Sequence, residues 1–197
     1  MKSTLNNTKT ATLKSAKTIF ASLILGGAVA GGASAADSSQ PKAAKVNVDA
    51  KQASARVKEN KLVADWVDLW NGNYSLAAAI VSPEVRVRAA LMDGGDGSAV
   101  KGSSGMVKFI TQIRSAFPDL HFDIEVGPII DGEHIVLRWI ATGTYAGGFP
   151  GATAPVGTKV TFTGTDMLKT EKGLITHYWL NADTLLVVNQ LKVGAAK

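Results

Sequence analysis

The stretch at residues 160–191, VTFTGTDMLKTEKGLITHYWLNADTLLVVNQL, predicts a β-hairpin followed by a closing helix. Side chains alternate between the two faces of an extended chain, so Asp166 shares a face with Phe162 and Leu168. Gly173 can take the positive φ that a tight hairpin turn requires. The first strand therefore places one carboxyl group on a face that is otherwise mainly apolar.

The returning strand carries hydrogen-bonding side chains on both of its faces. One face holds Ile175, His177, Trp179 and Asn181, and the other holds Leu174, Thr176, Tyr178 and Leu180. Apolar surface interrupted by a few polar groups is typical of a small-molecule pocket. We therefore expect the hairpin to line a binding site.

The first 35 residues have the features of a secretory signal peptide. Four lysines precede an uncharged apolar run at residues 19–30, and Ala33-Ser34-Ala35 matches the small-residue cleavage pattern. The run is shorter than the roughly 20 residues that cross a bilayer, so we expect no stable membrane anchor. These features predict cleavage after Ala35 and a secreted or periplasmic protein.

Most of the net charge of +5 belongs to residues 1–35, which hold four lysines and no acid. The rest of the chain has 17 basic and 16 acidic residues, a net charge of +1. Binding to nucleic acid requires a clustered basic surface, so we expect no nucleic-acid partner. Residues 36–55 contain few large apolar side chains and are predicted to be a linker before one domain at residues 56–193.

The remaining pattern predicts helices first and strands later. An amphipathic helix is expected at residues 55–71, with Trp66 and Trp70 interpreted as core packing rather than ligand stacking. Two shorter helices and one early strand follow, and the strands of a meander are expected at residues 120–126, 133–145 and 160–182. This order predicts an α+β fold in which a curved antiparallel sheet is closed by helices.

The glycine-rich loop after the early strand, MDGGDGSAVKGSSG, shows no ligand-binding motif. It lacks the Lys-Ser/Thr pair of a phosphate-binding P-loop and the terminal glutamate of a calcium-binding EF-hand. We therefore predict neither a nucleotide nor a metal at this loop.

Five segments, in this order along the chain, resemble the SnoaL-like polyketide cyclase family. They are LVADWVDLWNGN, AFPDLHFDIE, VLRWIATGTYAGGFPGATAPVGTKV, FTGTDMLKTEKG and ITHYWLNADTLLVVNQL, and they lie within residues 61–191. This family belongs to the larger group that shares the fold of nuclear transport factor two and ketosteroid isomerase. The resemblance implies a cone-shaped, curved antiparallel sheet packed against N-terminal helices.

The resemblance also implies acid–base chemistry without a metal or an organic cofactor, in a pocket between the sheet and the helices. The implied catalytic residues are Asp166 and His177, and the expected substrate-binding residues are Arg138, Trp139, Tyr145, Trp179 and Asp183. An acid among apolar side chains has a raised pKa and can accept a proton from a carbon acid. His177 would then donate a proton to the developing enolate, or orient the acid, and Arg138 would stabilise the negative charge.

Several of these residues also have a purely structural interpretation. Asp183 precedes TLLVVNQL and is well placed to cap the last helix. His177 can satisfy a neighbouring strand, and Arg138 can form a buried ion pair with Asp166 that leaves no free base. Tyr145, Tyr178 and Trp179 fit the wall of a pocket as well as a direct role.

Three functions are compatible with the sequence. The first is a cofactor-free cyclase or isomerase that acts on a small apolar carbonyl compound, with Asp166 and His177 within hydrogen-bond reach of each other. The second is a non-enzymatic protein that binds a small hydrophobic ligand in the same pocket. The third is a structural role as a homodimer that associates through the sheet. We expect a small apolar molecule and a second copy of the chain as partners.

Overall fold

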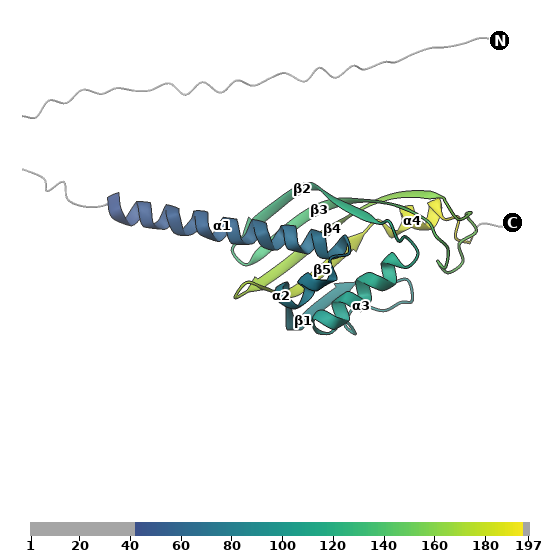
Figure 1. Cartoon of the computed structure of the whole chain (residues 1–197), viewed down its shortest axis with the longest axis horizontal. Coiled ribbons are helices and arrows are strands. Elements are labelled where there is room, and N and C mark those ends of the chain that lie inside the picture. The colour runs from purple at the N-terminus through teal and green to yellow at the C-terminus, as the bar shows by residue number, and fades with distance from the viewer. Residues whose placement is uncertain (1–41, 195–197) are drawn as a thin grey trace, which may run out of the picture. The chain divides into compact units, whose positions relative to one another are not determined.

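A computed structural model describes residues 42–194 of the chain, and the predicted signal peptide lies outside the described residues. The helices and strands follow one another in the predicted order, helices and one strand first and the meander later (Figure 1). Their bounds are α1 (Lys42–Trp70), η1 (Tyr74–Leu76), α2 (Ala77–Ile80), β1 (Val81–Ala89), α3 (Gly102–Arg114), β2 (His121–Asp131), β3 (His134–Thr144), β4 (Lys159–Glu171), β5 (Leu174–Ala182) and α4 (Thr184–Gln190).

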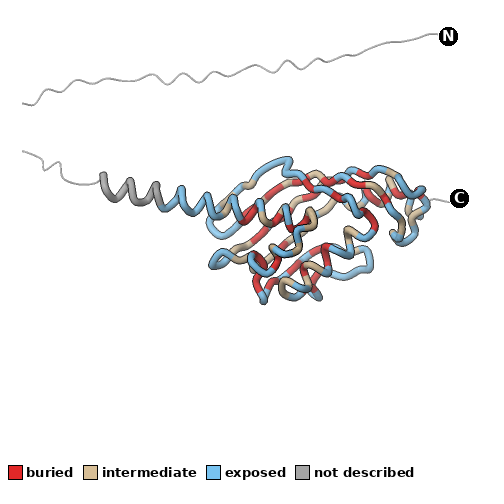
Figure 2. Tube along the Cα trace, viewed as in Figure 1, coloured by how far each residue is buried: buried red, intermediate tan, exposed pale blue. Residues whose placement is uncertain are grey.

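Helix α1 is longer than the sequence pattern predicted. It begins at Lys42, so residues 42–55, expected to belong to a linker, are helical. These residues are rich in alanine and lysine, both of which have a high intrinsic helix propensity. Residues 51–58 are exposed, and burial begins at Leu62 (Figure 2). Within residues 51–70 of α1, only the last turns therefore pack against the rest of the domain.

The five strands form one curved, mixed sheet in the order β1-β5-β4-β3-β2. Strands β2 to β5 pair antiparallel as a meander, which confirms the α+β prediction. Strand β1 pairs with β5 in parallel, an arrangement that the sequence pattern did not predict. The pairing brings the early strand beside the last one, and α3 packs on β1.

The β4–β5 hairpin contains a one-residue bulge. Its turn residues Lys172 and Gly173 both have positive φ, at 52° and 81°. Glu171 pairs with Leu174 and Thr170 with Ile175, but Lys169 then pairs with His177. The extra residue shifts the register beyond the turn by one position, and such a shift exchanges the two faces of a strand.

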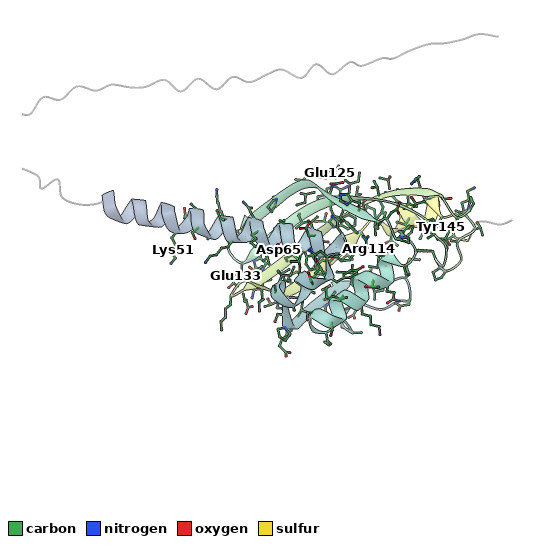
Figure 3. The ribbon with its side chains drawn as sticks, in the orientation of Figure 1. Lys51, Asp65, Arg114, Glu125, Glu133 and Tyr145 are labelled. Carbon is green, nitrogen blue, oxygen red and sulfur yellow. The ribbon has the colours of Figure 1, made fainter. Side chains whose placement is uncertain are left out.

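Two polar side chains fasten the helices to the strands. The Asn71 side chain exchanges hydrogen bonds with the backbone of Phe122, at 2.8 and 3.1 Å, and so joins the end of α1 to β2. Arg114, at the end of α3 (Figure 3), donates hydrogen bonds to the carbonyl oxygens of Trp70, Pro118 and Leu120. These contacts fix the C-terminal end of α1, which carries the tryptophans described below, over the inner face of the sheet.

Among residues 42–194, the structure contains no helix long and apolar enough to span a membrane.

Candidate functional site

The buried carboxylate of Asp166 is the centre of the site. The side chain projects from β4 between Leu137 of β3 and Leu180 of β5, its partners in the sheet register. Asp166 is only 3% exposed and, with Ser82, is one of two buried polar or charged residues in the described part of the chain. A charged group at such a position requires hydrogen-bond donors around it.

Three donors from three different elements surround this carboxylate. Trp66 of α1 donates from its indole nitrogen to Oδ2 at 2.8 Å. Trp139 of β3 donates its indole N–H to Oδ1 at 2.9 Å, and the hydroxyl of Tyr178 on β5 donates to the same oxygen at 3.1 Å. The acid therefore joins the first helix to the centre of the sheet through neutral donors.

The environment of Asp166 favours its protonated form more than water does. Burial raises the pKa of Asp166 to about 6, although the hydrogen bonds from Trp66, Trp139 and Tyr178 act in the opposite direction. Burial, together with the adjacent carboxylate, raises the pKa of Tyr178 well above its ordinary value, so this hydroxyl stays a donor. The pKa of Asp166 lies close to neutral pH, which is suitable for a group that both accepts and returns a proton.

This pKa predicts a pH dependence of stability. The folded state binds the Asp166 proton more tightly than the unfolded state, so this group stabilises the fold most below about pH 4. The stabilisation is lost as the pH rises through 6, and the change amounts to about 3 kcal/mol in the free energy of unfolding. Urea unfolding of the wild type and of Asp166→Asn at pH 4 to 7 measures this change. The relevant quantity is the difference between their free energies of unfolding at each pH.

That difference isolates Asp166 from other acids. Interactions in the folded state lower the pKa values of Asp96, Asp119 and Glu171, so these acids change stability in the opposite direction in both proteins. If the free energies of unfolding of the two proteins changed with pH in parallel, the pKa of Asp166 would be the same in the folded and the unfolded chain, and the prediction would be wrong.

Gly164 provides the space in which the Trp139 indole reaches Asp166. The two residues face each other across β3 and β4. A Cβ on Gly164 would overlap the six-membered ring of Trp139 and lie 2.8 Å from the carbonyl oxygen of Asn181. The absence of a side chain at this position is therefore a condition for the Trp139–Asp166 hydrogen bond.

We expect Gly164→Ala to destabilise the domain by about 1–3 kcal/mol, because the overlap forces the Trp139 ring away from its place. The measurement is chemical denaturation, with fluorescence reporting on the tryptophans. Gly105→Ala is a matched control, because in helix α3 the added methyl group meets only ordinary contacts of 3.5 Å or more. The prediction fails if both variants are as stable as the wild type.

A cavity of about 740 Å³ extends from Asp166 between the sheet and the helices. Its wall is mainly apolar and rich in aromatic residues, including three of the four tryptophans, namely Trp66, Trp70 and Trp139. Tyr178 and every phenylalanine of the described residues also line it. Both its size and its composition are those of a small-molecule site, in agreement with the sequence prediction.

The predicted contact between Asp166 and His177 is wrong. Asp166 and Tyr178 point to the inner face, whereas His177 pairs with Lys169 and belongs to the outer face of the sheet. There its ring stacks on Trp179, with centroids 5.4 Å apart, and its Nδ1 lies 3.2 Å from Thr176 Oγ1. The one-residue bulge in the hairpin causes this exchange of faces.

Three further predicted site residues also lie away from the cavity lining. Arg138 donates hydrogen bonds to Glu125 at 2.8 Å and to the hydroxyl of Thr163 at 3.0 Å on the outer face. The Arg138–Asp166 ion pair, which the sequence offered as the structural alternative, therefore does not form. Asp183 is the N-cap residue of α4, but its carboxylate accepts a hydrogen bond from Thr163 rather than from the helix backbone. Trp179 shares the outer face with His177.

The two remaining predicted residues behave differently from each other. Trp139 lies in the cavity wall and contacts Asp166. Tyr145 is buried close to Phe117, and its hydroxyl accepts a hydrogen bond from the backbone of Phe149 at 3.3 Å (Figure 3). Both phenylalanines line the cavity, so Tyr145 supports the wall from behind.

In residues 42–194 the structure shows no group of three or more His, Cys, Asp or Glu side chains placed to hold a metal ion.

The sequence of the chain matches one protein family. The family model for the SnoaL-like polyketide cyclases matches residues 56–191. The chain belongs to this SnoaL-like family. A comparison with curated proteins finds no match.

Several solved structures share the fold. A proposed polyketide cyclase from Acidithiobacillus ferrooxidans is 26% identical, with a TM-score of 0.61 over 70% of this chain and 96% of its own. TsrD from Streptomyces laurentii is 24% identical, with a TM-score of 0.59 over 72% of this chain and 98% of its own. A proposed SnoaL-like polyketide cyclase from Jannaschia is 19% identical, with a TM-score of 0.59 over 72% of this chain and 94% of its own.

In this SnoaL-like chain, sequence reasoning identified the acid but not all of its partners. Trp66 was interpreted as a core-packing residue, but its indole N–H also donates a hydrogen bond to Asp166. Tyr178 was interpreted as a wall residue, and it both lines the cavity and donates to the acid. A signal was present for Trp66, because buried indole nitrogens usually find a hydrogen-bond partner.

Proposed function

We propose that this protein binds a small, mainly apolar carbonyl compound in the cavity and that Asp166 exchanges a proton with it. The observation that supports the proposal best is a buried carboxylate in the wall of an aromatic cavity, with a pKa raised to about 6. The family supports binding or catalysis in such a pocket. The reaction would be a cofactor-free isomerisation or ring closure.

The proposed proton transfer uses Oδ2 of Asp166. Oδ1 already accepts two hydrogen bonds, whereas Oδ2 accepts one, from Trp66, and so has a lone pair available. This oxygen takes the proton from the carbon next to the carbonyl group, and the electron pair of the C–H bond moves into the enolate. The protonated acid then returns the proton to another carbon of the same molecule.

The charge on the enolate oxygen would be stabilised by neutral groups. The sequence suggested Arg138 and His177 for this role, and neither lines the cavity. The amide of Gln112, on α3, is a neutral hydrogen-bond donor in the lining. A water molecule held at the wall can serve in the same way.

A second candidate function is ligand binding without chemistry. Its support is the number of donors around Asp166, because three hydrogen bonds hold the carboxylate in place as a structural joint between α1 and the sheet. In that case the aromatic wall selects the ligand and the acid undergoes no proton transfer with it.

Thermal unfolding with a panel of aromatic ketones tests the cavity. A ligand at about 100 times its dissociation constant is expected to stabilise the protein by roughly 2.7 kcal/mol. Ala182→Phe is the matched control, because Ala182 lines the cavity and a phenyl group at this position would occupy part of the binding space. Equal shifts in both proteins, or none in either, would exclude the cavity as the binding site. Turnover of a bound ketone then separates the enzyme from the carrier.

We also propose that the chain forms a homodimer through the outer face of its sheet. The register aligns Ile129, Val136, Met167 and Trp179 in one row across four strands. Ile129 is 61% exposed and Met167 is 41% exposed. An exposed apolar row flanked by charged residues is a typical contact surface, and a twofold axis can place it against its own copy.

The dimer proposal predicts that Met167→Glu weakens self-association at least about 10-fold, because the two copies of the new carboxylate face each other. Sedimentation equilibrium of the wild type and the variant measures the effect. Val57→Glu is the control, because Val57 is 68% exposed on α1, away from the sheet. A wild type that sediments as a monomer at every concentration would refute the proposal.

We further propose that the protein is exported. The proposal is supported by the basic head, the apolar run at residues 19–30 and the Ala33-Ser34-Ala35 site. Expression of the full chain followed by intact-mass analysis of the extracytoplasmic fraction tests it. The expected mature protein begins at Ala36, and recovery of only uncleaved chain from the cytoplasm would contradict export.

A further inference from the structure

The cavity lining carries negative charge only. Its charged side chains are Asp93, Asp123 and Asp166, and no lysine, arginine or histidine of the described residues lines it. Asp93 and Asp123 are exposed, so they belong to the solvent-facing part of the lining, whereas Asp166 is buried. The exposed and the buried parts of the lining therefore both carry acids, although Asp123 Oδ1 lies 3.4 Å from Nε2 of His121, which is not in the lining.

Asp166 has no cationic partner within the described residues. Its three hydrogen bonds come from neutral groups, and none of the ion pairs of the structure includes it. Buried charges in proteins are usually paired with an opposite charge or bound to a metal. The negative charge at the wall is therefore stabilised by dipoles alone, and it acts on any ligand in the cavity.

The arginines of α3 and β3 form contacts with other groups. Arg114 donates to three backbone carbonyl groups where α1, α3 and β2 meet. Arg138 is on the outer face of the sheet, where it pairs with Glu125 and lies 4.0 Å from Asp183. Neither can neutralise Asp166 without leaving these contacts.

The aromatic part of the wall is suited to a positive charge. The indoles of Trp66, Trp70 and Trp139 and the phenol ring of Tyr178 surround the space next to the acid. The faces of aromatic rings carry partial negative charge and attract cations, most strongly in the case of indole. Oδ2 of Asp166 can accept one more hydrogen bond, which a charged N–H donor would make strongly.

We propose that the cavity selects its ligand by charge: it takes uncharged ring compounds as substrates, binds their protonated amine analogues more tightly as competitors, and rejects anionic analogues. The inference rests on the proposed function, because it concerns the same cavity and the same acid. It adds the charge class of the ligand and assigns Asp166 as the specificity-determining residue. A carboxylate would enter a low-dielectric site beside a like charge, with no cation to compensate.

Three compounds with one ring system test this charge selection. At pH 8 the ketone 2-acetylnaphthalene is neutral, the amine 2-(aminomethyl)naphthalene is cationic and the carboxylate 2-naphthoate is anionic. Titration calorimetry with the chain purified without residues 1–35 is expected to show that the amine binds about 10-fold more tightly than the ketone. The carboxylate is expected to bind at least about 100-fold more weakly than the ketone.

The Asp166→Asn variant separates the effect of charge from that of shape. Asparagine has nearly the same size but places an N–H donor where one carboxylate oxygen accepts hydrogen bonds, so affinities are compared within the variant. Relative to the ketone, the amine is expected to lose its advantage and the carboxylate to gain affinity. Because the order of the three wild-type affinities is itself decisive, the test does not depend on the folding of this variant.

The possible outcomes distinguish this inference from the proposed function. A carboxylate that binds as well as the ketone, or an amine that binds more weakly than the ketone, overturns charge selection and leaves the proposed function standing. Failure of all three compounds to bind overturns both. Competition of the amine with the ketone for one site, in the expected order, supports both.

Discussion

Asp166→Asn is expected to lower the turnover of a carbonyl substrate by about 10²–10⁴-fold, the range typical for the loss of a general base. The amide cannot accept a proton from carbon, whereas its shape closely matches that of the acid. Binding of the neutral substrate should therefore change little, so that kcat falls and KM is nearly constant. Steady-state kinetics with a compound identified by thermal stabilisation gives both parameters.

The comparison variant for this prediction is His177→Ala. His177 lies on the outer face of the sheet, stacked on Trp179, so its removal should leave turnover close to that of the wild type. Loss of turnover in His177→Ala alone would mean that the acid–base group is not Asp166. Full activity in both variants would exclude the proposed chemistry altogether.

Trp66→Ala is expected to destabilise the domain by about 3–5 kcal/mol, the range for the removal of a large buried aromatic side chain. Trp66 is fully buried and packs edge-to-face on Trp70 and Tyr178, with ring centroids 6.1 and 4.8 Å apart. The same substitution removes the only hydrogen bond to Oδ2 of Asp166 within the described residues. Equilibrium unfolding in urea measures the change.

Two further variants divide this effect into its parts. Trp66→Phe keeps a buried ring but removes the N–H donor, and the expected cost is about 1–3 kcal/mol, that of a buried acceptor left without its partner. Val57→Ala, on the exposed part of the same helix, should change stability by less than about 0.5 kcal/mol. A Trp66→Ala protein as stable as Val57→Ala would show that α1 does not hold the site together.

Much of the fold was predictable because its signals are local. The alternation at residues 160–168 and the Gly173 turn predicted the β4–β5 hairpin, and the polar residues before TLLVVNQL predicted α4. Burial confirms the interpretation of Trp66 and Trp70 as core residues. The predicted start of α1 was wrong because residues 42–55, which are rich in alanine and lysine, show no periodic apolar pattern that identifies a helix.

The candidate site was predictable only in part. Asp166 was identified from its apolar neighbours on one strand, and the rise of its pKa agrees with that reasoning. His177, Arg138, Trp179 and Asp183 were expected in the cavity, but they lie outside its lining. Both faces of β5 mix polar and apolar residues, so the sequence pattern alone does not indicate which of them points inward.

By itself, the sequence determined the α+β class, the hairpin with its closing helix and the acid on an apolar face. These features follow from side-chain alternation and turn chemistry within short segments. Only the tertiary structure decided what surrounds that acid. A one-residue bulge at Thr176 of β5 turned His177 outward and Tyr178 inward. The end of α1 placed the indole of Trp66 against Asp166, a residue 100 positions away in the chain. Bulges and long-range contacts depend on the packing of the whole domain, which no local pattern encodes.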